Sequence, residues 1–237
     1  MASQISMISG EYKVRTITGY EFDVIYTRSS TTVKECISRF KRMFENSNDE
    51  WVAGLDVEYT IVLGSEKKLK EAEKKKPAMI QVCVHDLCLV YHICHADVEC
   101  EEFKKFLKGG RVKFVTIDFR NDKEILGQIG LVVGQPFNIH KKSLVSSSQP
   151  SMLTLAGAMV HPMYGELKKA LHTFHRASQW TLDIDHIHYA AMDGYLCFNI
   201  YKGWMKSKSQ VCGSIKEVSP KRKRDKDEVE DVDEDSE

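Results

Sequence analysis

The sequence predicts an α/β domain built on a mixed β-sheet, followed by a charged C-terminal tail. Strand-like runs of β-branched and aromatic residues fill much of the first half of the chain, with helical patterns between some of them. Helical periodicity dominates after residue 150. The chain has 237 residues, 42% of them hydrophobic, which is enough for one substantial domain with a real core.

The first 47 residues predict a hairpin and a helix that pack on the rest of the domain. Residues 11–27 alternate apolar and polar side chains around Thr18 and Gly19, the pattern of two strands joined by a tight turn. Residues 30–45 follow a Ser/Thr cap and predict a helix. Its apolar stripe consists of Val33, Cys36, Ile37, Phe40, Met43 and Phe44.

Residues 48–206 form the main predicted domain, in which strands come first and helices later. The expected elements are a buried strand pair at 49–64, a solvated charged connector at 66–77, two strands at 78–93 joined at His85 and Asp86, a strand at 112–119, a short helix at 120–130, a loop at 146–151 and helices at 152–160, 165–178 and 183–205.

Residues 207–237 are predicted to form a disordered charged tail. From Ser219 onward the chain holds nine acidic and five basic residues and almost no apolar ones, so it cannot bury enough surface to offset the entropy of ordering. The rest of the chain carries 29 bases against 25 acids, a mildly basic balance that permits a polyanionic partner. The basic run PKRKR at 220–224 resembles a nuclear-localisation signal.

Cysteine usage and hydropathy indicate the compartment. The seven cysteines are odd in number and contain no CxxC pair, which favours reduced thiols over disulfides. The sequence shows neither a secretory leader nor an apolar run near the roughly 20 residues of a membrane helix. We therefore expect a nuclear protein without membrane partners, with the cytoplasm as the alternative.

Two acidic residues interrupt an apolar strand pattern. In WVAGLDVEYTIV, Asp56 and Glu58 are two residues apart, so both side chains project from one face of a strand. Adjacent carboxylates in an apolar strand repel each other and lose hydration unless a cation lies between them. The alternative is an edge strand with one solvated face, which is a common arrangement.

Further acids follow in two places. Asp118 lies within the predicted strand 112–119, and Asp122 lies just past its end, one helical turn before Leu126. A carboxylate at a helix N-terminus is also favoured simply as a cap, so capping is an alternative for Asp122. In YAAMDGY, Tyr189 and Asp193 are four residues apart and share one helix face. Alone, this pair reads as a half-buried aromatic beside a solvated acid.

Taken together, these motifs resemble the DEDDy class of 3′-to-5′ exonucleases, which have a ribonuclease-H-like fold. GLDVEYT resembles the first motif of that family, FVTIDFRNDKEIL the second and SQWTLDIDHIHYAAMDGY the third, including Trp180 before it. The resemblance covers roughly residues 52–204 and is closest to Werner-syndrome-type exonuclease domains, particularly those of small plant proteins. It implies a ribonuclease-H-like mixed sheet flanked by helices.

The resemblance also implies a chemistry and roles for five residues. Asp56 would bridge two divalent cations, Mg²⁺ or Mn²⁺, and Glu58 and Asp193 would complete the site of the attacking water. Asp122 would hold the second ion through water, and Tyr189 would orient the nucleophilic water. The implied reaction is the removal of nucleoside 5′-monophosphates from the 3′ end of DNA or RNA. Any unwinding would come from a helicase or repair partner.

An alternative function on the same fold is a catalytically impaired nucleic-acid-binding or scaffold protein. Thr116 and Asp118 stand where the family usually has small or apolar residues, which leaves the register of Asp118 against Asp122 open. The spacing to Leu126 favours Asp122 as the second-motif acid. Gly194 stands where alanine is usual, and glycine weakens a helix by roughly 0.5–1 kcal/mol.

A run of metal-binding residue types lies between residues 83 and 95. It contains Cys83, His85, Cys88, His92, Cys94 and His95. The run lacks the paired spacings of structural zinc sites, so the sequence favours core cysteines and scattered polar histidines.

Overall fold

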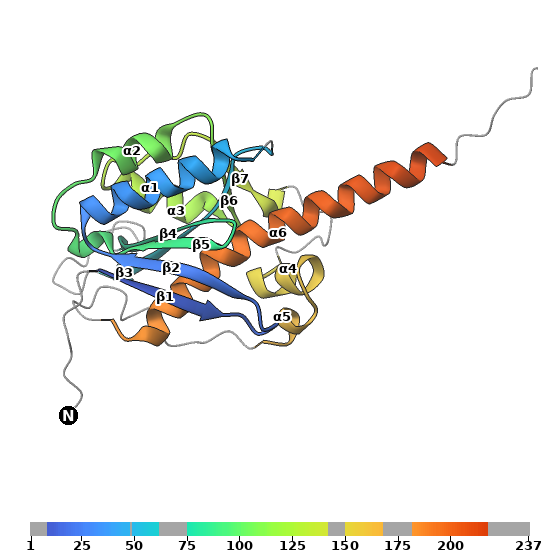
Figure 1. Ribbon diagram of the computed structural model, residues 1–237, viewed down its shortest axis with the longest axis horizontal. Helices are drawn as coiled ribbons and strands as arrows, with labels where there is room; N and C mark the ends of the chain where they lie inside the picture. Colours follow the sequence, from blue (N-terminus) through green and yellow to red (C-terminus); the bar gives the residue numbers. More distant parts are fainter. Residues whose placement is uncertain (1–8, 48, 62–74, 142–149, 168–181, 218–237) are drawn as a thin grey trace, which may run out of the picture. The chain divides into compact units, whose positions relative to one another are not determined.

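The computed structural model describes residues 9–47, 49–61, 75–141, 150–167 and 182–217. The chain divides into two units, Met1–Trp204 and Met205–Glu237. The first contains a seven-stranded sheet with helices on both faces (Figure 1). Its strands are β1 (Ser9–Arg15), β2 (Glu21–Thr27), β3 (Val52–Ile61), β4 (Lys75–Val84), β5 (Leu87–Tyr91), β6 (Lys113–Thr116) and β7 (Pro136–Asn138), and its helices are α1 (Ser30–Glu45), η1 (Ile93–His95), α2 (Glu101–Lys108), α3 (Phe119–Gly127), η2 (Ile139–Lys141), α4 (Met152–Met159), α5 (Met163–Glu166) and the first part of α6 (Ile184–Glu217).

The sheet is mixed, with strand order β1-β2-β5-β4-β3-β6-β7. The hairpin β1–β2 joins the sheet through parallel pairing of β2 with β5. Strands β5, β4 and β3 pair antiparallel, and β3, β6 and β7 pair parallel. The predicted mixed sheet flanked by helices is therefore confirmed, and the hairpin is continuous with it.

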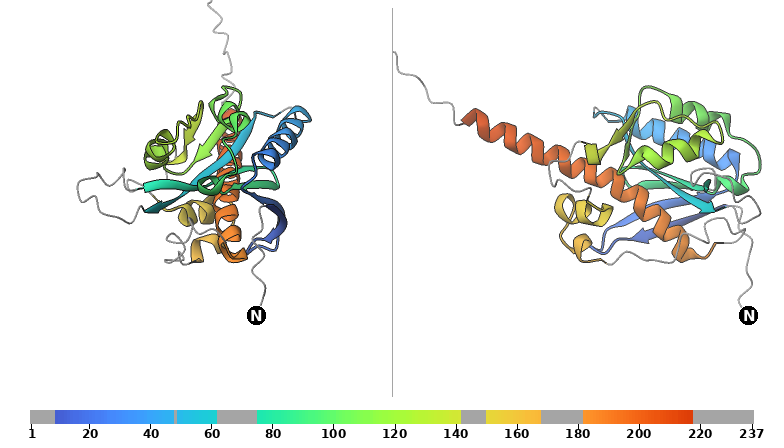
Figure 2. Two further views of the ribbon diagram at one scale, coloured as in Figure 1. Left: turned by 90° about the vertical axis from the view of Figure 1, so that its left-hand side faces the viewer. Right: turned by 180° about the vertical axis from the view of Figure 1, so that it is seen from behind.

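Two helical layers cover the two faces of the sheet (Figure 2). Helices α1, α2 and α3 pack on one face, where Phe40, Leu107 and Leu126 share a hydrophobic core with Leu55 and Val57 of β3. Helices α4, α5 and α6 pack on the other face in a second core. Because side chains alternate along a strand, Asp56, which lies between Leu55 and Val57, faces the α6 side.

Several elements differ from the sequence predictions. Residues 49–64 do not form a strand pair, because β3 runs unbroken from Val52 to Ile61 and takes its antiparallel partner from β4. Strand β6 ends at Thr116, earlier than expected. Helix α2 and strand β7 were not predicted; β7 has only three residues, too few to show a period.

The long helix α6 corrects the predicted start of the tail. It continues to Glu217, so residues 207–217 are helical rather than disordered. The PKRKR run, Trp180 and most of the connector 66–77 lie outside the described residues. In the described part of the chain, no helix combines the length and apolar character that crossing a membrane requires.

Candidate metal centre

The alternation of side chains along β3 places the first two residues of the site. Leu55 and Val57 point into the core under α1 and α3, so Asp56 and Glu58 point together toward α6. The alternative of a solvated strand face is wrong for Glu58, because its side chain is only 4% exposed. Two neighbouring carboxylates in such a position require a compensating charge.

Helix α6 brings the third carboxylate to this pair. One carboxylate oxygen each of Asp56, Glu58 and Asp193 lie within 4.8 Å of one another. Tyr189, one turn earlier on the same face of α6, donates a hydrogen bond from its hydroxyl to Asp193. Burial and then the carboxylates of Asp193, Glu58 and Asp56 raise the pKa of Tyr189 well above its ordinary value.

Asp122 reaches the same region from α3. Strand β6 pairs with β3 only at Val52–Gly54, so α3 begins beside the part of β3 that carries the acids. Burial, followed by the charges of Asp56, Asp118 and Glu58, raises the pKa of Asp122 to about 8. Asp122 therefore faces the acidic group, although it is not one of the three residues within 4.8 Å.

Cys197 lies beside the same acids. It lies one turn after Asp193, fully buried, and its pKa is raised first by burial and then by the charges of Asp56, Asp193 and Asp122. The thiol thus lies close to acids from β3, α3 and α6 at once. The sequence analysis did not single out Cys197, because nothing in a helical apolar run distinguishes a core cysteine from one beside a site.

Asp118 has a different position from the one predicted. It is not within a strand: it is the N-cap of α3, and its side chain accepts a hydrogen bond from the backbone nitrogen of Arg120 at 3.3 Å. The Arg120 guanidinium also binds it, at 2.9 and 2.6 Å. These contacts hold the pKa of Asp118 below its ordinary value. Capping therefore belongs to Asp118, which leaves Asp122 as the acid that faces the site.

The glycine at 194 has a packing role. A Cβ atom there would lie 3.0 Å from the Cβ of Gln81 and 3.4 Å from the sulfur of Cys88. Opposite it, a Cβ on Gly54 would meet the Gly194 carbonyl oxygen and, at 2.6 Å, the backbone nitrogen of Phe198. Glycine at both positions lets α6 lie directly against the sheet, which explains the departure at Gly194 without loss of the site.

Gln81 is a further site neighbour that the sequence analysis missed. It is the cross-strand partner of Asp56 and is fully buried. Neither its amide nitrogen nor its amide oxygen has a hydrogen-bond partner among the described residues. A polar residue in the middle of the apolar run AMIQVCV was the available signal.

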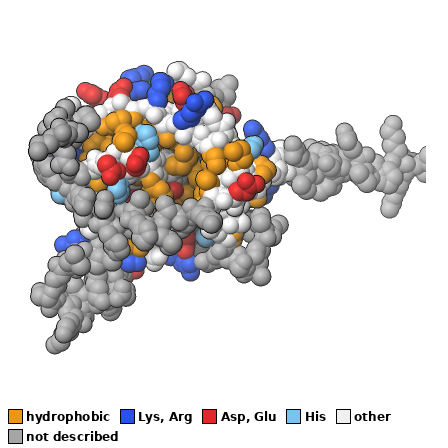
Figure 3. Space-filling view, turned by 90° about the horizontal axis from the view of Figure 1, so that it is seen from below, with side chains coloured by type: hydrophobic (Ala, Val, Ile, Leu, Met, Phe, Trp, Pro, Cys, Tyr) orange, Lys and Arg blue, Asp and Glu red, His pale blue; other side chains and the backbone are white. Residues whose placement is uncertain are grey.

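The donor set fits divalent cations of the Mg²⁺ and Mn²⁺ type. Three carboxylates offer oxygen atoms only, the ligand type that these ions prefer over zinc. Burial and then repulsion by neighbouring carboxylates raise the pKa of Asp122, and a bound cation would remove that repulsion. The unsatisfied amide of Gln81 beside Asp56 also fits a site completed by a ligand. One face of the molecule shows acidic side chains set among hydrophobic and histidine side chains (Figure 3).

The mixed seven-stranded sheet with helices on both faces is an α/β fold like that of ribonuclease-H-like exonuclease domains. The EXO domain of Aedes aegypti Nibbler superposes with a TM-score of 0.56 at 12% identity, over 78% of this chain and 88% of that one. The catalytic core of RRP6 from Trypanosoma brucei gives a TM-score of 0.59 at 10% identity, over 90% of this chain and 54% of that one.

Two other solved structures carry ligands. Trypanosoma brucei RNase D in complex with GMP gives a TM-score of 0.54 at 14% identity, over 84% of this chain and 58% of that one. Brucella melitensis NrnC with bound Mg²⁺ gives a TM-score of 0.51 at 13% identity, over 73% of this chain and 80% of that one. No protein-family model and no curated protein matches the sequence. At these identities the likeness concerns the fold.

Proposed function

We propose that this protein is a metal-dependent 3′-to-5′ exonuclease that releases nucleoside 5′-monophosphates from nucleic acid. The observation that carries the proposal is the convergence of Asp56, Glu58 and Asp193 within 4.8 Å, on a fold shared with exonuclease domains. Asp122 and Tyr189 border the same group. The narrower assignment to Werner-syndrome-type domains remains a prediction from the sequence motifs.

Each site residue has a proposed role that follows from its position. Asp56, Glu58 and Asp193 would hold the cations, with Asp122 on the α3 side. When bound, two divalent cations supply an activated water near neutral pH and neutralise charge on the leaving 3′-oxygen. Tyr189 keeps its proton because of its raised pKa, so its hydroxyl would orient the attacking water rather than deprotonate it.

The substrate class follows from the proposed reaction and from the ligands of structural neighbours. RNase D has been solved with RNA U12 and NrnC with pGG. We therefore propose short single-stranded RNA as the first substrate to test, with DNA of the same sequence beside it. A duplex with a 3′ overhang completes the set.

The test follows degradation of 5′-labelled strands by the full chain in Mg²⁺, in Mn²⁺ and in EDTA. We expect a ladder that shortens from the 3′ end, 5′-mononucleotides as products, and no reaction in EDTA. Asp56→Asn and Asp193→Asn should each lower the rate at least about 100-fold, the scale of losing one charge-stabilising group. Glu102→Gln, which removes an exposed carboxylate on the opposite helical layer, should leave the rate unchanged.

Two outcomes would reject the proposal. A circular strand has no 3′ end, so its cleavage would indicate an endonuclease instead. A folded wild type that binds the strands without cutting any of them would indicate the alternative, a nucleic-acid-binding protein on this fold.

A further inference from the structure

A second group of metal-binding side chains lies at η1, immediately after β5. Ligand atoms of His92, Cys94 and His95 lie within 4.8 Å of one another. In a 3-10 helix, residues three apart lie on the same side, which places the rings of His92 and His95 together. Their centroids are 4.7 Å apart at an interplanar angle of 84°. The short spacing H-x-C-H therefore converges in space without the paired spacings of a zinc finger.

One side of this group is buried in the core and the other is exposed to solvent. His92 is fully buried, His95 is half-buried and Cys94 is exposed. The hydroxyl of Tyr26 lies 2.7 Å from Nδ1 of His92, inside the core. A hydrogen bond to one ring nitrogen fixes the orientation of a histidine ring, as is usual for histidine ligands of a metal.

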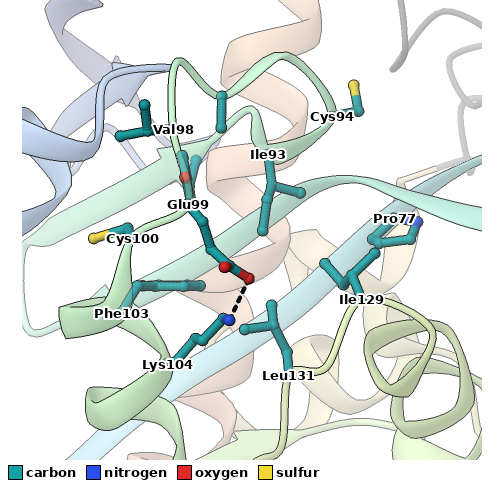
Figure 4. Close-up of a pocket in the computed structure, with 12 residues that line it drawn as sticks. Pro77, Ile93, Cys94, Val98, Glu99, Cys100, Phe103, Lys104, Ile129 and Leu131 are labelled. Atoms are coloured by element: carbon teal, nitrogen blue, oxygen red, sulfur yellow. Dashed lines mark ion pairs between the residues drawn. The ribbon is translucent and has the colours of Figure 1, made fainter.

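The group is separate from the acidic site and borders a neighbouring cavity, which Cys94 helps to line. Asp56 pairs with Gln81, and Gln81 pairs with Val90, which lies two residues before His92 on the next strand. A cavity of about 260 Å³ lies beside η1, lined by Ile93, Phe103 and Leu131 among others. Figure 4 shows Ile93 pointing into this cavity and the sulfur of Cys94 pointing away from it.

We propose that His92, Cys94 and His95 form a binding site for a Zn²⁺ ion. One thiolate and two imidazoles suit zinc, whereas Mg²⁺ and Mn²⁺ prefer oxygen ligands, so the two sites of this chain select different metals. The three side chains leave a fourth position of the tetrahedron open to water, on the exposed side of Cys94. On binding, the Cys94 thiol loses its proton to solvent and the sulfur bonds to the metal.

Cobalt substitution tests the site directly, because a thiolate bound to Co²⁺ gives a near-ultraviolet charge-transfer band that oxygen ligands do not give. The full chain is stripped of metal, titrated with Co²⁺ and then with Zn²⁺. We expect a band that saturates at one ion per chain and disappears as Zn²⁺ displaces Co²⁺. Cys94→Ser should abolish it, and Cys212→Ser, at a cysteine of the second unit, should keep it. Asp193→Asn should also keep it, which separates this site from the acidic one.

Tyr26→Phe tests the geometry without removing a ligand. Loss of the partner of Nδ1 should weaken Co²⁺ binding by about 10- to 100-fold, the usual effect of removing such a partner. Circular dichroism of each variant verifies folding. The proposal is overturned if folded wild type gives no charge-transfer band, or if the band persists unchanged in Cys94→Ser.

Discussion

The backbones of Gly54 on β3 and Gly194 on α6 lie in direct contact, so that a Cβ atom on Gly54 would collide with the carbonyl oxygen of Gly194. Gly54 lies two residues before Asp56, and Gly194 directly follows Asp193. The distance between these two carboxylates therefore depends on how closely the helix approaches the strand. Any side chain at position 54 must move α6 away from the sheet.

Gly54→Ala should consequently reduce both stability and nuclease activity. Overpacking of this kind costs about 1–3 kcal/mol in the free energy of unfolding, because neither backbone can yield locally. Urea denaturation measures that loss, and the exonuclease assay measures the effect of separating Asp56 from Asp193. The matched control is Gly127→Ala in α3, where nothing lies within 4 Å of the added Cβ and stability should stay the same or rise by about 0.4–1 kcal/mol. Wild-type stability and activity in Gly54→Ala would contradict the close packing described above.

Asp118 and Asp122 should respond differently to the same substitution. Asp118→Asn keeps a side chain that can cap α3, and its partner Arg120 is exposed, so activity and stability should stay close to wild type. Asp122→Asn removes a carboxylate that faces Asp56 and Glu58, and should lower the exonuclease rate at least about 100-fold. Single-turnover rates of the two variants in Mg²⁺ show which of the two acids the reaction needs. The opposite pattern would make Asp118 the second-motif acid.

The sequence predicted most strands, the helix α1 and the alternation that puts Asp56 and Glu58 on one face, because each depends on local periodicity. It favoured Asp122 over Asp118 but left their register open, since settling that register required the end of β6 at Thr116, and a four-residue strand shows little pattern. The role of Gly194 also escaped it. Helix propensity predicts only that glycine weakens a helix. The packing against Gln81 involves a residue that is distant in the sequence.

The distances in the histidine and cysteine run were likewise beyond sequence reasoning. Cys83 and Cys88 are buried in the core as expected, but Cys94 is exposed and lies with His92 and His95. The strand β5 ends at Tyr91, and the 3-10 helix η1 that follows has a period of three, which the absence of paired spacings in the sequence did not reveal.

Without metal, the stability of the protein should depend on pH through Asp122. Its folded pKa of about 8 lies above the ordinary value of 3.8, so between these values the folded state binds more protons than the unfolded state. The contribution of Asp122 to stability therefore falls as pH rises from about 4 to about 8, by on the order of a few kcal/mol. Asp122→Asn lacks this titration, so its stability relative to wild type should increase over the same range.

Thermal unfolding in EDTA at several pH values measures this difference. Added Mg²⁺ or Mn²⁺ should reduce the pH dependence of wild-type stability, because a bound cation stabilises the ionised carboxylates and the folded state that holds them. A constant difference between wild type and Asp122→Asn from pH 4 to pH 8 would show that Asp122 does not share a charged site with Asp56 and Glu58.

Tyr189→Phe should separate orientation of the water from metal binding. The three carboxylates that would hold the cations remain, so stabilisation by Mn²⁺ in thermal unfolding should persist. The rate should fall about 10- to 100-fold, the value of one hydrogen bond to a charged or reacting group. Since burial and the neighbouring acids raise the pKa of Tyr189 well above its ordinary value, the hydroxyl stays protonated throughout the assay range.

The pH–rate profile then distinguishes an orienting hydroxyl from a general base. Wild type and Tyr189→Phe should give profiles of the same shape, displaced by a constant factor. Tyr201→Phe is the matched control on α6, because that hydroxyl donates to Glu50 at 2.8 Å and accepts from Lys113 at 3.2 Å. Its rate should stay at the wild-type level. An alkaline rise in the wild-type profile that Tyr189→Phe lacks would identify Tyr189 as the base and contradict the orienting role, because only an ionising hydroxyl produces such a difference.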